Sequence, residues 1–199
     1  MAKEALVLFG ASGHAKVVID IVEKEGRYGI VHLVDDNAAL HGKPFFGYPV
    51  KGSLDTFLAQ AKAKRAKVLV SIGDNAVRAR IARRLRDAGF EFARAVHPQA
   101  QVGRGASIGA GTVVMAGAVV NSDAAIGENV IINTGATVDH DCKVGDGAHL
   151  APGVRLCGGV QVGAGALVGV GSVAIPGIRI GANAVVRAGS VLTENVGTK

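Results

Sequence analysis

The sequence has little of what several protein classes require. It contains only two cysteines, Cys142 and Cys157, no tryptophan and eight aromatic residues in a chain of 199. Two cysteines cannot build the disulfide framework of a small secreted protein, so we expect a reduced, cytoplasmic chain. No apolar run approaches the roughly 18 residues of a membrane-spanning helix, and no apolar segment followed by a cleavage site stands at the N-terminus. Membrane insertion is therefore not expected.

Negative charge is scarce in the first half only. The net charge is +6, and residues 1–97 carry 16 Lys and Arg against 10 Asp and Glu, whereas residues 98–199 carry six of each. Much of the excess lies in one predicted helix, which we interpret as a solvent-exposed face: Arg78, Arg80, Arg83, Arg84 and Arg86. No aromatic platform accompanies these residues, so nucleic acid is not an expected partner. Attraction of an anionic small molecule stays open.

What the sequence does have is a repeat of six residues. An aliphatic side chain recurs at every sixth position from Val102 to Leu192, sixteen times, with only Ala174 undersized. A period of six fits neither a helix nor a long alternating strand. A glycine-rich low-complexity segment would let the phase slip, and here it never does. The pattern predicts a hexapeptide β-helix, in which three units make a triangular coil and sixteen units make about five coils.

The first half predicts a small parallel α/β domain. The expected elements are strands over 5–10, 30–34, 68–72 and 90–96, helices over 15–22, from Ser53 to about Lys64 and from residue 74 or 75 to Ala88, and an extended loop or small hairpin over 44–52. His97 and Pro98 end this part of the chain. We therefore expect a Rossmann-like domain over 1–97 and a β-helix over 98–199.

The α/β domain carries two ligand-type turns. Gly10 to His14 joins the first strand to the first helix and leaves backbone N–H groups free at the helix N-terminus, where an anion can bind. Asp35 and Asp36 end the second strand, where dinucleotide folds hold a ribose or base. Gly10 and Gly13 lack the third glycine of G-x-G-x-x-G, which disfavours a nicotinamide cofactor. A tight turn without a ligand stays the alternative for both glycines.

One hexad departs from the repeat. It places His140 and Asp141 where most units carry Gly, Ala or Asn, and the next hexad ends with His149. Histidine can move a proton near neutral pH, and an adjacent carboxylate can fix its tautomer. No Ser or Cys stands in an elbow motif beside it, which favours base catalysis over a covalent acyl-enzyme. The alternative is that both histidines are polar residues of a solenoid face. Together with Cys142 they match no standard zinc spacing, so no metal is expected.

Together these motifs resemble the sialic acid/bacillosamine-type sugar O- or N-acetyltransferases. The resemblance rests on residues 9–14, 34–37, 71–75 with Arg78, 95–98, Asn133-Thr134 and His140-Asp141-Cys142, and it covers nearly the whole chain. It implies a homotrimer of left-handed parallel β-helices, each with an N-terminal nucleotide-sugar-binding domain, and acetyl-CoA between neighbouring β-helices. The left-handed connection would run against the usual preference.

The resemblance also implies roles for single residues. His140 would be the general base, and Asp141 would increase its basicity. Asn133 would contact the sugar, while His149 and the backbone N–H of Gly158 would face the acetyl thioester. The nucleotide pocket would be lined by Gly13, His14, Asp35, Asp36 and Gly73.

We therefore expect acetyl-CoA-dependent N-acetylation of a UDP- or GDP-linked amino-sugar in surface glycan synthesis. O-acetylation of a sugar such as sialic acid would use the same residues. A non-catalytic trimeric scaffold that binds sugar nucleotides is the alternative from another class. Residues 193–199 lack the apolar Gly-x-Pro-Ala-like tail of related chains, so we expect either a shortened chain or a different hold on CoA.

Overall fold

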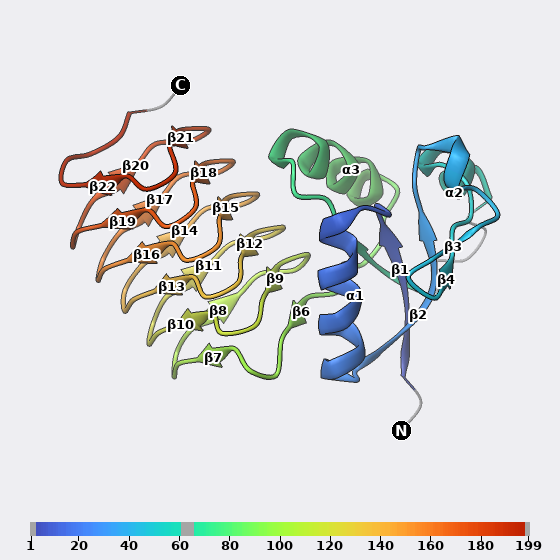
Figure 1. Ribbon diagram of the computed structural model, residues 1–199, viewed down its shortest axis with the longest axis horizontal. Helices are drawn as coiled ribbons and strands as arrows, with labels where there is room; N and C mark the ends of the chain where they lie inside the picture. The colour runs from blue at the N-terminus through green and yellow to red at the C-terminus, as the bar shows by residue number, and fades with distance from the viewer. Residues whose placement is uncertain (1–2, 61–65, 198–199) are drawn as a thin grey trace.

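The computed structural model describes residues 3–60 and 66–197. A small α/β domain stands beside a β-helix whose coils stack along one axis (Figure 1). No helix within the described ranges is long and apolar enough to cross a membrane.

The N-terminal domain is built on a parallel sheet with the strand order β2-β1-β5. Its elements are β1 (Glu4–Phe9), α1 (Gly13–Glu25), β2 (Tyr28–Val34), η1 (Ala38–Leu40), β3 (Pro44–Phe45), β4 (Tyr48–Pro49), α2 (Leu54–Gln60), β5 (Lys67–Val70) and α3 (Asn75–Asp87). β3 and β4 form the predicted hairpin. Asp74 caps α3 by accepting the N–H of Val77. The predicted end of α2 near Lys64 lies outside the described residues.

The β-helix has three faces, each made of two-residue strands that pair in parallel. The first face contains β6 (Ala95–Val96), β9 (Val113–Val114), β12 (Ile131–Ile132), β15 (His149–Leu150), β18 (Leu167–Val168) and β21 (Val185–Val186). The second contains β7 (Gln101–Val102), β10 (Val119–Val120), β13 (Thr137–Val138), β16 (Arg155–Leu156), β19 (Val173–Ala174) and β22 (Val191–Leu192). The third contains β8 (Ser107–Ile108), β11 (Ala125–Ile126), β14 (Lys143–Val144), β17 (Gln161–Val162) and β20 (Arg179–Ile180).

The repeat register confirms the predicted coils. Each strand pairs with the strand eighteen residues later, as Ile132 does with Leu150. The repeated aliphatic side chains point inward and are buried from Val114 to Val186, where they form one continuous core. At the open first coil the side chain of Val102 is 44% exposed, because no coil lies below it to cover it. Stacking between coils therefore supplies the burial that a single hexad lacks.

Two predictions were wrong. Residues 90–96 do not form one strand of the N-terminal domain, because only Phe92 bridges to Val68 and β6 pairs with β9 of the β-helix. Val96 is in phase with the hexads, six residues before Val102, so the first coil begins earlier than expected. The arginines of α3 are not all solvent-exposed either: Arg78 is 1% exposed.

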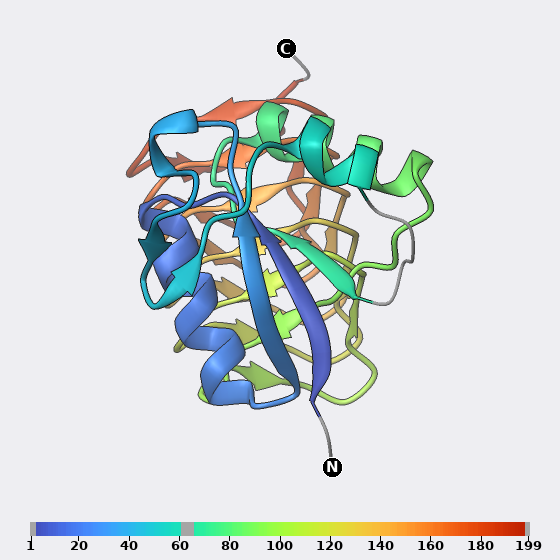
Figure 2. The same cartoon turned by 90° about the vertical axis from the view of Figure 1, so that its right-hand side faces the viewer.

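The two domains share apolar packing. α1 lies between the small sheet and the first face of the β-helix (Figures 1 and 2). Val18 and Ile21 of α1 belong to the same buried cluster as Ala95, Val113 and Ile131 of the β-helix. Continuous burial across the junction fixes how the N-terminal domain is presented to the coils.

Candidate functional site

His140 lies at an exposed corner between the second and third faces, which we call the 2–3 corner. The turn joins β13 to β14 and places Asp141 in a left-handed conformation with φ 59°, which Asp tolerates better than most residues. The Nδ1 atom of His140 lies 2.7 Å from Oδ2 of Asp141, and the imidazole is 62% exposed. The hydrogen bond to Asp141, helped by the charge of Asp139, raises the pKa of His140 above its ordinary value.

A second carboxylate, missed by sequence reasoning, braces the same turn. Oδ1 of Asp139 accepts the backbone N–H of His140 at 2.8 Å and the amide of Asn121, one coil below, at 2.9 Å. These two hydrogen bonds lower the pKa of Asp139, so it stays ionised beside the imidazole. The signal was present in the sequence, because carboxylates stand on both sides of His140.

Gly158 stands one coil above His140, and the structure brings the two residues together. A Cβ at position 158 would lie 2.6 Å from both Cε1 and Nε2 of His140, so only glycine leaves room for the ring. The neighbouring N–H of Gly159 donates to the carbonyl of His140 at 2.9 Å. The N–H of Gly158 has no acceptor within the described part of the chain. It is free to donate to a ligand beside Nε2.

A different group forms where the N-terminal domain meets the first face. The amide Nδ2 of Asn133 lies 3.0 Å from Nε2 of His149, whose ring is also near the carbonyl of Gly73. Burial, and then the charge of Arg78, lowers the pKa of His149 to about 4. His14 is close by, and burial followed by the charges of His149 and Arg78 lowers its pKa to about 4 as well. Both imidazoles are therefore neutral at pH 7.

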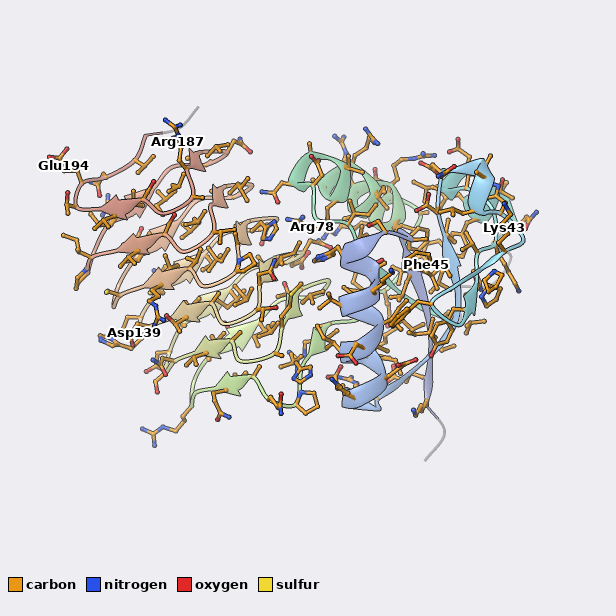
Figure 3. All side chains as sticks on the ribbon, in the orientation of Figure 1. Lys43, Phe45, Arg78, Asp139, Arg187 and Glu194 are labelled. Atoms are coloured by element: carbon orange, nitrogen blue, oxygen red, sulfur yellow. The ribbon has the colours of Figure 1, made fainter. Side chains whose placement is uncertain are left out.

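Within one chain these two groups lie apart. His140 belongs to the 2–3 corner, whereas His149 lies in β15 on the first face. Asn133 directly follows β12 of the same face, at the corner between the first and second faces, which we call the 1–2 corner. Figure 3 shows Asp139 on the side of the β-helix that faces away from the N-terminal domain, and Arg78 at the junction. The structure thus joins His149 to Asn133, Gly73 and His14 and does not bring it to Gly158 of its own chain.

A cavity of about 260 Å³ opens beside the carboxyl ends of β1 and β2. Among the predicted nucleotide residues, it is lined by Asp35 and Asp36. Their carboxylates also brace the backbone: Asp35 accepts the N–H of Ala11 at 2.7 Å, and Asp36 accepts the N–H of Leu54 at 3.0 Å. Asp35 thereby holds the glycine turn in place. The remaining wall is largely apolar, with Phe9, Val34, Leu54, Ile72, Val77 and Ile81, and Arg80 adds a cation.

The two glycines of the first turn differ in what they require. Gly10 has φ 112°, and a Cβ there would lie 2.7 Å from Cγ1 of Ile72 and 3.0 Å from the carbonyl of Ser71. A Cβ at Gly13 would meet no atom within 4 Å, and the φ of Gly13 is not positive. Gly10 is therefore needed by the fold itself, whereas the open space at Gly13 leaves the N-terminus of α1 accessible to a ligand.

No cluster of three or more His, Cys, Asp or Glu that could hold a metal ion occurs in the described part of the chain. The chemistry available at the 2–3 corner is proton transfer by an imidazole next to a free backbone N–H. A hexad β-helix with such a corner defines the class of hexapeptide-repeat acyltransferases.

Comparison with known families agrees with this class and narrows it. The PglD N-terminal domain family matches residues 5–85, the bacterial transferase hexapeptide family (six repeats) matches residues 123–158, and the hexapeptide repeat of succinyl-transferase matches residues 159–194. UDP-N-acetylbacillosamine N-acetyltransferase of Bacillus subtilis (strain 168) is 36% identical over 113 residues, which cover 56% of this chain and 51% of that protein. The match thus spans about half the length of this curated relative.

Solved structures match over the full chain. Perosamine N-acetyltransferase from Caulobacter crescentus, a histidine variant in complex with CoA and GDP-perosamine, is 40% identical and superposes with a TM-score of 0.92, covering 100% of this chain and 92% of its own. The acetyltransferase domain of PglB from Neisseria gonorrhoeae FA1090 in complex with acetyl coenzyme A is 32% identical with a TM-score of 0.90, covering 98% and 94%. The chain belongs to this family of sugar N-acetyltransferases with a PglD-type N-terminal domain and hexapeptide repeats, which confirms the resemblance.

Proposed function

We propose that this chain is an acetyl-CoA-dependent N-acetyltransferase of a UDP- or GDP-linked amino-sugar in surface glycan biosynthesis. The observation that carries the proposal is the exposed pair of His140 and Asp141, with Nε2 of the imidazole lying against Gly158. Two relatives support it, since one is in complex with CoA and GDP-perosamine and another with acetyl coenzyme A. The free thiols of Cys142 and Cys157 fit a reducing, cytoplasmic compartment.

His140 is the general base of the proposed reaction. Asp141 accepts the Nδ1–H, which leaves the lone pair of Nε2 free to face the ligand. Nε2 removes a proton from the sugar amine as the nitrogen bonds to the acetyl carbonyl carbon. The Gly158 N–H donates to the carbonyl oxygen while it carries negative charge. The C–S bond then breaks, and the imidazolium returns its proton to the departing thiolate.

The acceptor binds on the side of the N-terminal domain. The nucleobase and ribose occupy the cavity beside Asp35 and Asp36, and the diphosphate lies at the N-terminus of α1, near Gly13 and His14. The first N–H groups of α1 favour negative charge there. Asn133 and His149 lie where the sugar leaves the domain junction. This arrangement directs the sugar towards the outer end of the 1–2 corner.

The base must then come from another protomer, and we infer a homotrimer. His140 is on the 2–3 corner and Asn133 on the 1–2 corner, with the second face between them. This face and its corners carry exposed aliphatic side chains: Val191 is 68%, Val170 53% and Ile175 39% exposed. Contact between the 2–3 corner of one protomer and the 1–2 corner of the next covers them and closes a ring of three. Acetyl-CoA binds between the neighbouring β-helices.

The test is CoA release from acetyl-CoA with a panel of UDP- and GDP-linked amino-sugars and free sialic acid. Wild type should turn over one amino-sugar, and His140→Ala should lose at least about a hundredfold in kcat, as expected for removal of a general base. Because the side chain is 62% exposed, the melting temperature should be unchanged. Turnover of sialic acid alone would replace N- by O-acetylation. Absence of both turnover and acetyl-CoA binding would reject the enzyme hypothesis in favour of the non-catalytic scaffold that binds sugar nucleotides.

A further inference from the structure

Arg78 is a buried cation whose hydrogen-bonding capacity is fully used. It is 1% exposed, and none of its hydrogen-bond acceptors is a carboxylate. Its guanidinium donates to five acceptors on three segments: the carbonyls of Ile72 at 3.1 Å and Gly73 at 3.0 Å, Oδ1 of Asn75 at 2.8 Å, and the carbonyls of Asn129 at 2.9 Å and Gly147 at 2.7 Å. Burial lowers the pKa of Arg78 to about 10, which keeps it charged at pH 7. All five N–H groups are therefore satisfied.

These bonds tie the acceptor domain to two coils of the β-helix. Asn129 and Gly147 are eighteen residues apart and lie on successive coils at the 3–1 corner, between the third and first faces. Gly73 lies on the loop that follows β5. Arg78 thus fixes the height of this loop against the coil that carries His149. A planar fork reaches acceptors on several sides, which a lysine ammonium cannot do.

Near this loop, hydrogen bonds connect Thr134, Asn133 and His149, and their donors and acceptors can be assigned in only one way. The backbone N–H of Thr134 donates to Oδ1 of Asn133 at 2.8 Å, so the amide nitrogen must face Nε2 of His149. Nε2 therefore accepts, and the proton of the neutral ring sits on Nδ1. One hydrogen of the Asn133 amide remains without an acceptor within residues 3–60 and 66–197. The network leaves it as a donor for a ligand.

We propose that Arg78 is a positioning residue of the acceptor site, which acts through the coil that carries Gly147 and His149 to hold the Asn133 amide as a hydrogen-bond donor towards the acceptor sugar. This rests on the proposed function only for the identity of the sugar. The assignment of donors and acceptors in this network is a property of the protein without any ligand. The charge of Arg78 acts in the same sense, because it opposes protonation of His149 and so preserves Nε2 as an acceptor.

The matched pair of variants is Arg78→Lys and Arg86→Lys. Both arginines lie on α3, and both bind the β-helix, but Arg86 pairs with Glu128 on the surface and is not bonded to Gly73 or His149. Arg78→Lys should lower kcat/KM for the acceptor about tenfold through misplaced contacts, with the KM for acetyl-CoA unchanged. Arg86→Lys should change neither. In an Asn133→Ala background the Arg78→Lys loss should vanish, because both act through one amide.

A second measurement needs no turnover. The ¹⁵N shifts of His149, assigned with His149→Gln, should show the Nδ1–H tautomer in wild type and in Arg86→Lys, and a mixture of tautomers in Arg78→Lys. An Nε2–H tautomer in wild type, an unchanged tautomer in Arg78→Lys, an equal change in Arg86→Lys, or additive losses with Asn133→Ala would each overturn the proposal. Should Arg78→Lys fail to fold, Arg78→Gln takes its place in both measurements, and an Nε2–H tautomer in wild type still overturns the proposal. If no acceptor is acetylated but the tautomers behave as expected, the proposed function fails and the network stands.

Discussion

The reactivity of His140 depends on two flanking carboxylates that have separate tasks. Asp141 bonds the ring nitrogen and Asp139 bonds the backbone of the same residue. The first sets the tautomer and raises basicity, whereas the second holds the turn that presents the ring. Both carboxylates favour the protonated imidazole, so the base is stronger than an isolated histidine but is in its active form only at higher pH.

Asp141→Asn should therefore alter the pH profile of the reaction. In the proposed reaction, activity requires neutral His140 and rises as pH passes upward through its pKa. Loss of the Asp141 hydrogen bond lowers that pKa, so the acidic limb of kcat/KM should move to lower pH. The plateau should fall by about tenfold, because the weaker base is also less well oriented. Asp123→Asn is the matched control, since Asp123 stands one coil below with the same φ of 59°. A limb that moves to higher pH would contradict this role.

Gly158→Ala should inactivate the enzyme without unfolding it. The new methyl would lie 2.6 Å from the His140 ring and would push it aside, so we expect a loss of about a hundredfold in kcat. Gly158 does not have a positive φ, so the backbone accepts alanine. Gly159→Ala is the opposite case, with open space but a φ of 70°. It should cost about 1 kcal/mol of stability and less activity. Equal activity losses in the two variants would disprove steric control of the ring.

At the scale of elements, the β1–α1 turn contains Gly10, which the fold requires, and Gly13, which we propose lies against the ligand. Gly10→Ala should lower the free energy of unfolding by about 1–3 kcal/mol through strain and overpacking against Ile72. Gly13→Ala should leave the melting temperature equal or slightly higher and raise the KM for the nucleotide-sugar. Thermal unfolding and acceptor KM, measured on both variants, check this. If the acceptor KM were raised only in Gly10→Ala, the proposed phosphate site at the N-terminus of α1 would be wrong.

Elements set by local periodicity could be predicted, and contacts between distant segments could not. The hexads defined every coil from Val102 onward because each aliphatic side chain needs the coil above and below it. The strand of β6 was predicted, but its pairing with β9 was missed because residues 90–96 were assigned to the N-terminal domain and Val96 was not counted with the hexads. The burial of Arg78 was missed because two of its five acceptors are carbonyls of residues 51 and 69 positions away, which carry no sequence signal. The pairing of His140 with Asp141 was visible only because the two are adjacent.

At the scale of the whole molecule, one protomer holds its two groups of candidate site residues apart. His140 is presented at the 2–3 corner, while Asn133 and the cavity beside Asp35 and Asp36 belong to the other side of the second face. The exposed side chain of Val191 lies on that face. In the proposed trimer, each 2–3 corner has a partner and no surface of this kind is left unpaired. Each proposed site draws His140 from one protomer and Asn133 from the next.

This arrangement predicts that two impaired variants complement each other. His140→Ala and Asn133→Ala should each lose most of their activity as pure trimers, and Asn133→Ala should keep a weak, measurable turnover. A mixed trimer holds two copies of one variant and one of the other, so the intact histidine meets an intact asparagine at about a third of its sites. Co-expression with different tags and purification on both tags gives such trimers, and the two proteins mixed without subunit exchange are the control. If co-assembled trimers are as impaired as the pure ones, both residues act from one chain. In that case the active site is not shared between two protomers.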